Sequence, residues 1–256
     1  QRLMTKTIKS IFFIAIIMLL AACGTPNNIN YMQDIKANDI INITPKDIRL
    51  LPGDKISIFV KSKDDVLTEH FNISLPNMQK ILSYTIDPNG EVDFPMIGKI
   101  KLSDKTRSEA AETIKSKLVE EYGVKDAIVT LDFSNLKVSV LGEVNKPGSI
   151  SIDKDNINIL EALSMAGDMT IYGKRQDIMV VRDNGKQKET YIVDITSAKE
   201  AMSSPAFYLK QNDIVYVPAN KTRQRQSTTN GNNLQSTSFW ISIASLITTI
   251  AVVVFK

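Results

Sequence analysis

The sequence predicts an α+β fold, in which two small mixed-sheet domains are followed by a C-terminal membrane-spanning α-helix. Residues 46–133 and residues 134–218 each combine short alternating strands with one main helical segment, which is typical of α+β domains. A polar stretch at 219–238 then separates these domains from an almost wholly apolar segment at 239–255. The chain therefore divides into two folded domains, a polar linker and a terminal apolar helix.

A separate apolar run lies near the start of the chain. Two lysines precede an unbroken apolar stretch at 11–20, so residues 1–22 have the pattern of a secretory signal peptide. The small residues that end at Cys23 resemble the bacterial lipoprotein box, which implies cleavage before Cys23 and lipid attachment to its thiol. The alternative is a structural cysteine behind an ordinary signal peptide. It is weaker because the chain has one cysteine and no second one for a disulfide.

The residues around Cys23 bear on location and on charge. Gly24 follows the cysteine where an inner-membrane retention signal has aspartate, so the resemblance implies the outer membrane. Residues 23–45 are polar and are predicted to form a lipidated tether with too little apolar surface to pack. The signal peptide carries the whole formal charge of +3. The mature chain is therefore balanced, which excludes the basic surface of a nucleic-acid-binding protein.

The first domain is predicted to hold four strands and one long helix. The dipeptide Asn89-Gly90 between two alternating runs indicates a β-hairpin. Apolar residues at i, i+4 spacing give the helix one buried face, and Gly123 ends it. In chain order the expected elements are a strand at 56–60, paired strands at 84–86 and 91–94, a helix from Ser103 or Asp104 to Tyr122, and a strand at 127–133.

The second domain is also rich in predicted strands. A second Asn-Gly pair, at 184–185, predicts another hairpin, and Gly167 stands where a glycine commonly ends a helix. Pro218 terminates the last strand. The expected elements are a strand at 138–144, a helix at 157–166, hairpin strands at 178–182 and 190–193, and a strand at 214–217.

Short motifs occur in a fixed order across both domains. The first domain resembles the polysaccharide export domain in Leu51-Pro52-Gly53-Asp54, Tyr84-x-Ile86-Asp87-x-x-Gly90-Glu91 and Phe94-Pro95-x-Ile97-Gly98. The second domain resembles the soluble-ligand-binding β-grasp (SLBB) module in Val140-Leu141-Gly142-Glu143-Val144-x-Lys146-Pro147-Gly148, Ala166-Gly167 and Asn212-Asp213-Ile214-Val215-Tyr216-Val217-Pro218. The chain is thus similar to the outer-membrane lipoproteins that export capsular polysaccharide and exopolysaccharide, and it has room for one β-grasp module.

Ten residues of these motifs are expected to shape turns and the starts of strands rather than to touch a substrate. They are Pro52, Gly53, Asp54, Gly90, Pro95, Gly98, Gly142, Pro147, Gly148 and Asp213. The glycines would permit positive φ, and the two aspartates would bond to the following backbone. The alternative, that such turns line a channel between the subunits of a ring, stays open.

The apolar segment 239–255 would be about 25 Å long as a helix, which suits the thin outer membrane. Trp240 stands where an interfacial aromatic residue belongs. A hydroxyl stripe on one side of this helix consists of Ser238, Ser242, Ser245 and Thr249. In one interpretation several copies form a helical barrel and the stripe faces a wet lumen. In the other, the hydroxyls bond their own i−4 carbonyls or the stripe packs against another helix.

The sequence predicts no catalysis, no cofactor and no metal. His70 is the only histidine and is expected on an exposed loop, so no Ser-His pair is available without it. A metal cluster of His and Cys is missing from the sequence. Many carboxylates are present, but nothing selects the facing pair that a glycosidase needs.

The resemblance implies a passive conduit. It would be a homo-oligomeric ring in the outer membrane, lipid-anchored and mostly periplasmic, with a bacterial polysaccharide as cargo. The chain would contact the membrane through its lipid and its C-terminal helix, and an inner-membrane polysaccharide co-polymerase or chain-length regulator would be its partner. The alternative is a periplasm-facing lipoprotein that binds glycan or a partner, with the C-terminal helix as a plain anchor and no pore.

Overall fold

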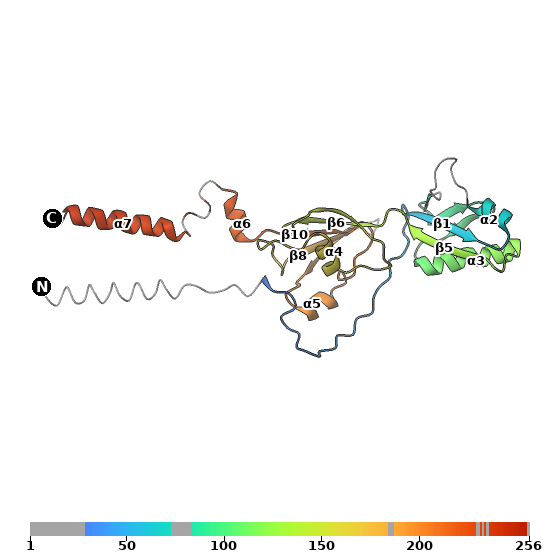
Figure 1. The fold of residues 1–256 in the computed structure, drawn as a ribbon, viewed down its shortest axis with the longest axis horizontal. Helices are drawn as coiled ribbons and strands as arrows, with labels where there is room; N and C mark the ends of the chain where they lie inside the picture. Colours follow the sequence, from blue (N-terminus) through green and yellow to red (C-terminus); the bar gives the residue numbers. More distant parts are fainter. Residues whose placement is uncertain are drawn as a thin grey trace.

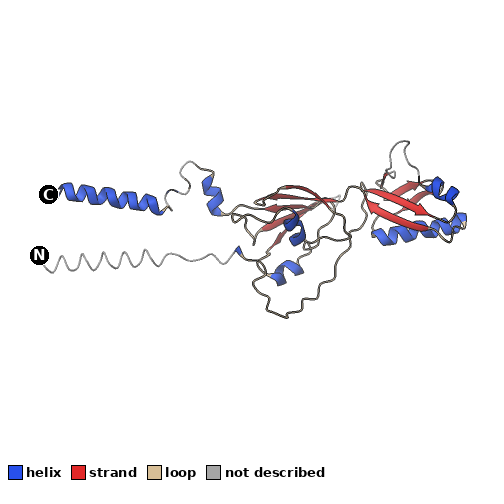
Figure 2. Ribbon diagram, in the orientation of Figure 1, coloured by secondary structure: helices blue, strands red, loops and turns tan. Residues whose placement is uncertain are grey.

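The computed structural model describes residues 29–72, 83–183, 187–228, 231, 233 and 236–254. Two mixed α/β units follow one another along the chain, and α6 (Lys221–Gln226) and α7 (Thr237–Val254) extend beyond the second unit (Figure 1). Within the described residues, all strands belong to these two units (Figure 2). The predicted signal peptide with Cys23, the Asn-Gly turn at 184–185 and Lys256 lie outside the described residues.

The first unit combines a three-stranded antiparallel sheet of order β2-β1-β5 with a separate β3-β4 hairpin. Helix α3 covers the sheet through Ala110, Ile114 and Leu118, which are fully buried. In chain order its elements are β1 (Lys55–Lys61), α2 (Asp65–Phe71), β2 (Ser83–Thr85), β3 (Glu91–Phe94), β4 (Gly98–Lys101), α3 (Arg107–Tyr122) and β5 (Ile128–Phe133).

The hairpin predicted around Asn89-Gly90 is wrong. Strand β2 pairs with β1, whereas β3 pairs with β4, so the runs on either side of this turn do not pair with each other. The side chain of Asp87 accepts hydrogen bonds from the backbone N–H groups of Asn89 (2.9 Å) and Glu91 (2.8 Å). These hydrogen bonds close the turn without pairing the strands on either side of it, and β2 pairs with the central strand β1 instead.

Two further predictions for the first unit need correction. Helix α3 begins after Thr106 rather than after Ser103 or Asp104, because the Thr106 hydroxyl accepts the Glu109 N–H while the Glu109 carboxylate accepts the Thr106 N–H. His70 lies in the short helix α2 and not on a loop; its side chain is exposed.

The second unit is a five-stranded sheet of order β7-β6-β10-β8-β9, in which β10 runs parallel to β6 and the other pairs are antiparallel. Helix α4 packs on one face through Ile159, Ala162 and Leu163. The predicted hairpin of 178–182 with 190–193 is confirmed by the β8–β9 pairing. The elements are β6 (Lys137–Gly142), β7 (Gly148–Ser151), α4 (Ile159–Met165), β8 (Ile178–Asp183), β9 (Lys188–Val193), α5 (Ala198–Ser203) and β10 (Ile214–Val217).

The described end of the predicted tether is docked on the second unit. Met32 donates its backbone N–H to Ile195 (3.0 Å), and Gln33 donates to Thr196 (2.7 Å). The Tyr31 ring lies 5.2 Å from the guanidinium carbon of Arg175. The prediction that this polar segment does not pack is therefore wrong for these residues. Backbone hydrogen bonds hold the segment on the second unit, although it has little apolar surface to bury.

Asp34 completes this docking by capping α5. Its carboxylate accepts hydrogen bonds from the Ser197 hydroxyl (2.7 Å) and from the N–H groups of Ala198 (2.6 Å) and Lys199 (3.2 Å). These hydrogen bonds lower the pKa of Asp34 to about 2, and the bond from the Ser197 hydroxyl has the largest effect. The carboxylate thus stays ionised, and the chain that leads from Cys23 is fixed to the second unit at neutral pH.

The predicted polar linker 219–238 is partly helical. Asn220 caps α6 through the Arg223 N–H (2.9 Å), and the guanidinium of Arg223 pairs with Glu143 of the second unit (3.1 Å). Helix α7 then begins at Thr237. Composition alone missed α6 because its residues bury no apolar side chain.

The predicted C-terminal membrane-spanning helix is wrong. In the described part of the chain, no helix combines the length and the apolar character needed to cross a membrane. Helix α7 starts with Thr237-Ser238 and carries further hydroxyl residues along its 18 residues.

Candidate functional site

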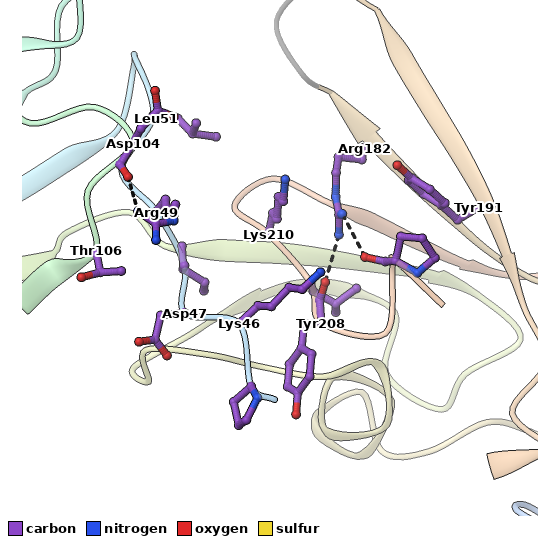
Figure 3. Close-up of a pocket in the computed structure, with 14 residues that line it drawn as sticks. Lys46, Asp47, Arg49, Leu51, Asp104, Thr106, Arg182, Tyr191, Tyr208 and Lys210 are labelled. Carbon is purple, nitrogen blue, oxygen red and sulfur yellow. Dashed lines mark hydrogen bonds between the residues drawn. The ribbon is translucent and has the colours of Figure 1, made fainter. Parts of the chain in front are cut away.

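A cleft of about 590 Å³ lies where the chain passes from the second unit to the first (Figure 3). The connecting segment is held in place by one buried residue in each unit. Ile48 is buried in the core of the second unit and donates its N–H to Asp155 (2.8 Å). Leu50 is buried in the core of the first unit and donates to Lys105 (2.9 Å). Because side chains alternate along an extended chain, Asp47 and Arg49 are left exposed beside the cleft.

The second unit supplies the wall that carries a buried ion pair. Arg182 of β8 and Asp213 before β10 have side chains only 7% and 0% exposed. The Arg182 Nε lies 3.0 and 3.2 Å from the two carboxylate oxygens, and its Nη2 lies 2.7 Å from Oδ2. The guanidinium also donates to the carbonyls of Pro205 (3.3 Å) and Tyr208 (3.0 Å). This arginine therefore holds the 205–213 loop against the sheet.

Arg182 was missed by the sequence analysis, although the sequence held a signal for it. It occupies the same face of its strand as Ile178 and Val180, which are buried. An arginine on the buried face of a strand requires a buried group of opposite charge or hydrogen-bond acceptors. Asp213 accepts the Lys210 N–H (2.8 Å) as well as the arginine, so it bonds to the chain that precedes β10 rather than to the strand itself.

Some exposed polar side chains of the cleft already form hydrogen bonds or ion pairs, and others form none. Arg49 donates to the backbone carbonyl of Asp104 and to Glu109 (3.2 Å). Lys46 and Lys210 are exposed, and their ammonium groups make no hydrogen bond or ion pair with the described residues. The cleft thus has two uncompensated positive charges on the side of the second unit.

Two tyrosines line the same side. The Tyr191 ring lies 5.5 Å from the guanidinium carbon of Arg182, and its hydroxyl donates to Glu189, a hydrogen bond that raises the tyrosine pKa. Tyr208 packs edge-on against Phe207 with ring centroids 5.3 Å apart. Aromatic faces beside charged side chains are common in ligand sites at domain boundaries.

None of the ten predicted motif residues lines this cleft. In the first unit they lie in turns. The Asp54 carboxylate accepts the N–H of Leu51 (2.8 Å), which precedes it, so the predicted bond to the following backbone is wrong for Asp54. Burial raises the pKa of Asp54. Four glycines of the set have positive φ, from +76° to +93°. The remaining turn residues are Pro52 next to Gly53, Pro95 between β3 and β4, and Pro147 with Gly148 at the start of β7.

Gly142 is the most constrained of these glycines. Its φ is +93°, and a Cβ built there would lie 2.0 Å from the backbone oxygen of Val217. The glycine therefore lets β6 approach the end of β10 closely. Gly90 is similar, with a Cβ position 2.1 Å from the Ser103 hydroxyl.

The hydroxyl stripe of α7 bonds within its own helix. Ser242 donates to the Ser238 carbonyl and Thr249 to the Ser245 carbonyl, each at 2.9 Å. This is the i−4 bonding that the second interpretation expects. The lumen-facing interpretation requires a membrane-spanning helix, and the described residues contain none. Trp240 is 58% exposed and packs edge-on against Phe239.

Nothing in the described residues resembles a metal centre, since no cluster of three or more His, Cys, Asp or Glu side chains is found there. The His70 ring nitrogen Nδ1 lies 2.6 Å from the Val66 carbonyl on the same helix. The exposed histidine thus faces its own backbone and no nucleophile.

Comparison with known proteins places the two units in described families. The model of the family "Polysaccharide biosynthesis/export protein" matches residues 42–134, and the SLBB domain model matches residues 136–217. The EPS I polysaccharide export outer membrane protein EpsA of Ralstonia nicotianae is 30% identical over 183 residues, which are 66% of this chain and 46% of that protein. The protein of the same name from Ralstonia solanacearum is 28% identical over 183 residues, again 66% of this chain and 47% of that protein.

A third relative is the exopolysaccharide production protein ExoF of Rhizobium meliloti, 32% identical over 88 residues, which are 34% of this chain and 21% of that protein. The chain spans about half the length of the two curated Ralstonia relatives. The matches to both units, in this order, agree with the motifs found along the sequence.

Proposed function

Because this chain belongs to the polysaccharide biosynthesis/export protein family and carries an SLBB domain, we propose that it is a subunit of a bacterial outer-membrane assembly that exports polysaccharide. The family resemblance predicted from the motifs is confirmed. The observation that carries the proposal is the pair of family matches, which together run from residue 42 to residue 217. Members of this family are non-enzymatic transport components, in agreement with the prediction that the chain is not an enzyme.

The proposed location is the outer membrane, with a lipid on Cys23 and most of the chain in the periplasm. Two relatives are named outer membrane proteins. Tyr31, which is docked on the second unit, lies eight residue steps after Cys23. An extended chain of that length spans at most roughly 28 Å, so the lipid would keep the second unit close to the membrane surface.

Replacing Cys23 by serine should abolish lipid attachment. Wild-type protein is expected to incorporate radiolabelled palmitate and to sediment with the outer membrane, because the acyl chains bury methylene groups in the bilayer. The Cys23→Ser variant should do neither. An unlabelled wild-type protein that stays in the aqueous phase would remove the lipid anchor from the proposal.

We further propose that copies of the chain form a ring through which the polymer passes. A ring requires a surface that contacts a different surface on the next copy. The outer face of the second sheet offers a row of apolar side chains on four neighbouring strands: Leu141, Tyr216, Met179 and Ile192. Leu141, Tyr216 and Ile192 are 44%, 41% and 59% exposed. An exposed sheet face is usually polar, so this row favours contact with a neighbouring copy.

The first unit would then meet the inner-membrane partner. The first unit lies on the side of the second unit opposite to α7 (Figure 1). A lipid on Cys23 would hold the second unit at the membrane through the docked residues 32–33, and the first unit would then extend toward the periplasm. A polysaccharide co-polymerase or chain-length regulator is the partner that we propose there. The cargo is the polysaccharide that it delivers.

The mass of detergent-extracted particles tests the ring. The wild-type chain should form closed particles of one stoichiometry, whereas Ile192→Lys should dissociate them by placing a charge in the apolar row. Ile40→Lys is the matched control, since Ile40 is 86% exposed and lies outside the row. A wild-type chain that is monomeric at every concentration would favour the alternative, a lipoprotein that binds glycan or a partner without forming a conduit.

A further inference from the structure

We propose that the cleft between the two units binds a short stretch of acidic sugar chain, with a sugar carboxylate held between Lys46 and Lys210. The proposal rests on the proposed function, since it names the chemical class of the cargo at one site. The cleft volume of about 590 Å³ falls within the range of pockets that bury small ligands.

Three polar side chains of the cleft already bond other groups of the protein. Arg182 is engaged by Asp213 and two backbone carbonyls, and this buried pair is neutral as a whole. Arg49 is engaged with Glu109 and a backbone carbonyl. The Tyr191 hydroxyl is engaged with Glu189. These groups build the walls and leave little capacity to bind a ligand.

The two lysines and Tyr208 remain. Figure 3 shows Lys46, Lys210 and Tyr208 toward the second-unit side of the cleft, with Asp104 and Thr106 toward the first-unit side. Neither lysine has a polar partner within the described residues, and no hydrogen bond of the Tyr208 hydroxyl is found there. Three uncommitted donors therefore line one side of the cleft, spaced along it rather than gathered at one point (Figure 3).

The two acidic side chains that line the cleft, Asp47 and Asp104, lie toward the first unit (Figure 3). Asp104 stands beside Arg49 in the loop before α3, and Asp47 accepts a hydrogen bond from the Asn156 side chain (3.3 Å). Glu189 accepts the Tyr191 hydroxyl and does not line the cleft. The lysine charges are thus not neutralised in place, and an anionic group of the ligand is the counter-charge that fits.

The chemistry of an acidic sugar matches these three donors. Ammonium groups form charge-assisted hydrogen bonds with a carboxylate, and the Tyr208 hydroxyl can bond a sugar hydroxyl. The apolar face of a pyranose can pack on the tyrosine ring, which offers a flat apolar surface with a polar end. A neutral sugar would use the tyrosine but leave both ammonium groups without a counter-charge.

Isothermal titration calorimetry on the lipidated protein, purified from membranes in detergent, tests the site, with hexagalacturonate as the acidic probe and maltohexaose as the neutral probe. The wild type should bind the acidic probe at least about tenfold more tightly, and the affinity should fall as salt is raised. The double variant Lys46→Ala/Lys210→Ala should lose about tenfold or more for the acidic probe and change little for the neutral one.

Lys125→Ala is the matched control, an exposed lysine of the first unit outside the cleft. Thermal unfolding of each variant shows that the fold is intact. Equal affinity for the two probes, an unchanged affinity in the double lysine variant, or no binding of hexagalacturonate by the wild type would each overturn the site. None of these results depends on ring formation or on export in cells, so a failure here leaves the proposed export function standing.

Discussion

Replacing Asp213 by alanine is expected to destabilise the second unit by about 3–5 kcal/mol, because Arg182 would stay buried without its counter-charge. The two side chains are 7% and 0% exposed, and three of the five Arg182 hydrogen bonds go to this carboxylate. The two remaining bonds go to the carbonyls of the 205–208 loop. Without Asp213 the arginine would no longer be held in position to bond this loop. Loop 205–213 forms one wall of the cleft, so the ligand site should be lost with it.

The measurement is denaturant unfolding followed by far-ultraviolet circular dichroism, with hydrogen exchange at β6 and β10 to locate the loss. Tryptophan fluorescence would report poorly, since the single tryptophan, Trp240, lies in α7 outside the second unit. Asp153→Ala is the matched control, because Asp153 is exposed and its carboxylate makes no hydrogen bond in the described structure. Its effect should stay within about 0.5 kcal/mol.

A second variant separates the missing charge from the missing packing. Arg182→Met combined with Asp213→Leu should recover much of the lost stability, because a buried ion pair and a well-packed apolar pair of similar volume are close in free energy. An Asp213→Ala protein as stable as the wild type would contradict the buried pair. It would mean that Arg182 reaches water in solution.

Local patterns predicted the elements better than the pairing between them. The strand at 214–217 and the β8–β9 hairpin follow from alternation and from an Asn-Gly turn within a short stretch of chain. The pairing of β1 with β2 and β5 joins residues far apart in sequence, and no local signal specifies it. The hairpin signal at Asn89-Gly90 failed because Asp87 bonds the turn backbone itself.

The cleft could not be predicted because its walls come from segments that are distant in the sequence. Lys46 belongs to the connecting segment, Arg182 to β8 and Lys210 to the loop before β10. Each of them looks like an ordinary charged residue when it is seen alone. Of these three residues, only Arg182 has a local sequence pattern that predicts burial, since it lies on the buried face of its strand.

Apolar composition also misled the sequence analysis at the C-terminus. The run 239–255 was predicted to span a membrane from its length and its aliphatic residues. Helix α7 instead includes hydroxyl residues from Thr237 onward, and some of them bond their own helix. The aliphatic residues outweighed these hydroxyl groups in the prediction, whereas the described helix does not combine the length and apolar character needed to cross a membrane.

The largest effect in cells should follow deletion of the gene. The polymer should still be made, because the chain supplies no catalytic group to its synthesis, but it should no longer reach the surface. Surface polysaccharide is expected to fall to background while polymer accumulates inside the envelope. The wild-type chain, returned on a plasmid, should restore display.

His70→Ala should restore display equally well in the same strain. The histidine is exposed, and its ring nitrogen contacts only the backbone of its own helix in the described structure. A folded His70→Ala protein that fails to restore display would return catalysis to consideration. The double lysine variant, measured beside it, reports how far the cleft contributes to export.

The most direct test of the central claim is the ratio of surface polysaccharide to total polysaccharide, measured in the deletion strain and in the complemented strain with a radiolabelled sugar precursor. For an export subunit, total label should be retained while the surface fraction collapses on deletion and returns on complementation. An unchanged surface fraction in the deletion strain, in the absence of a second copy of the gene, would contradict the assignment to polysaccharide export. A fall in total label with an unchanged surface fraction would contradict it as well, since the chain would then act in synthesis.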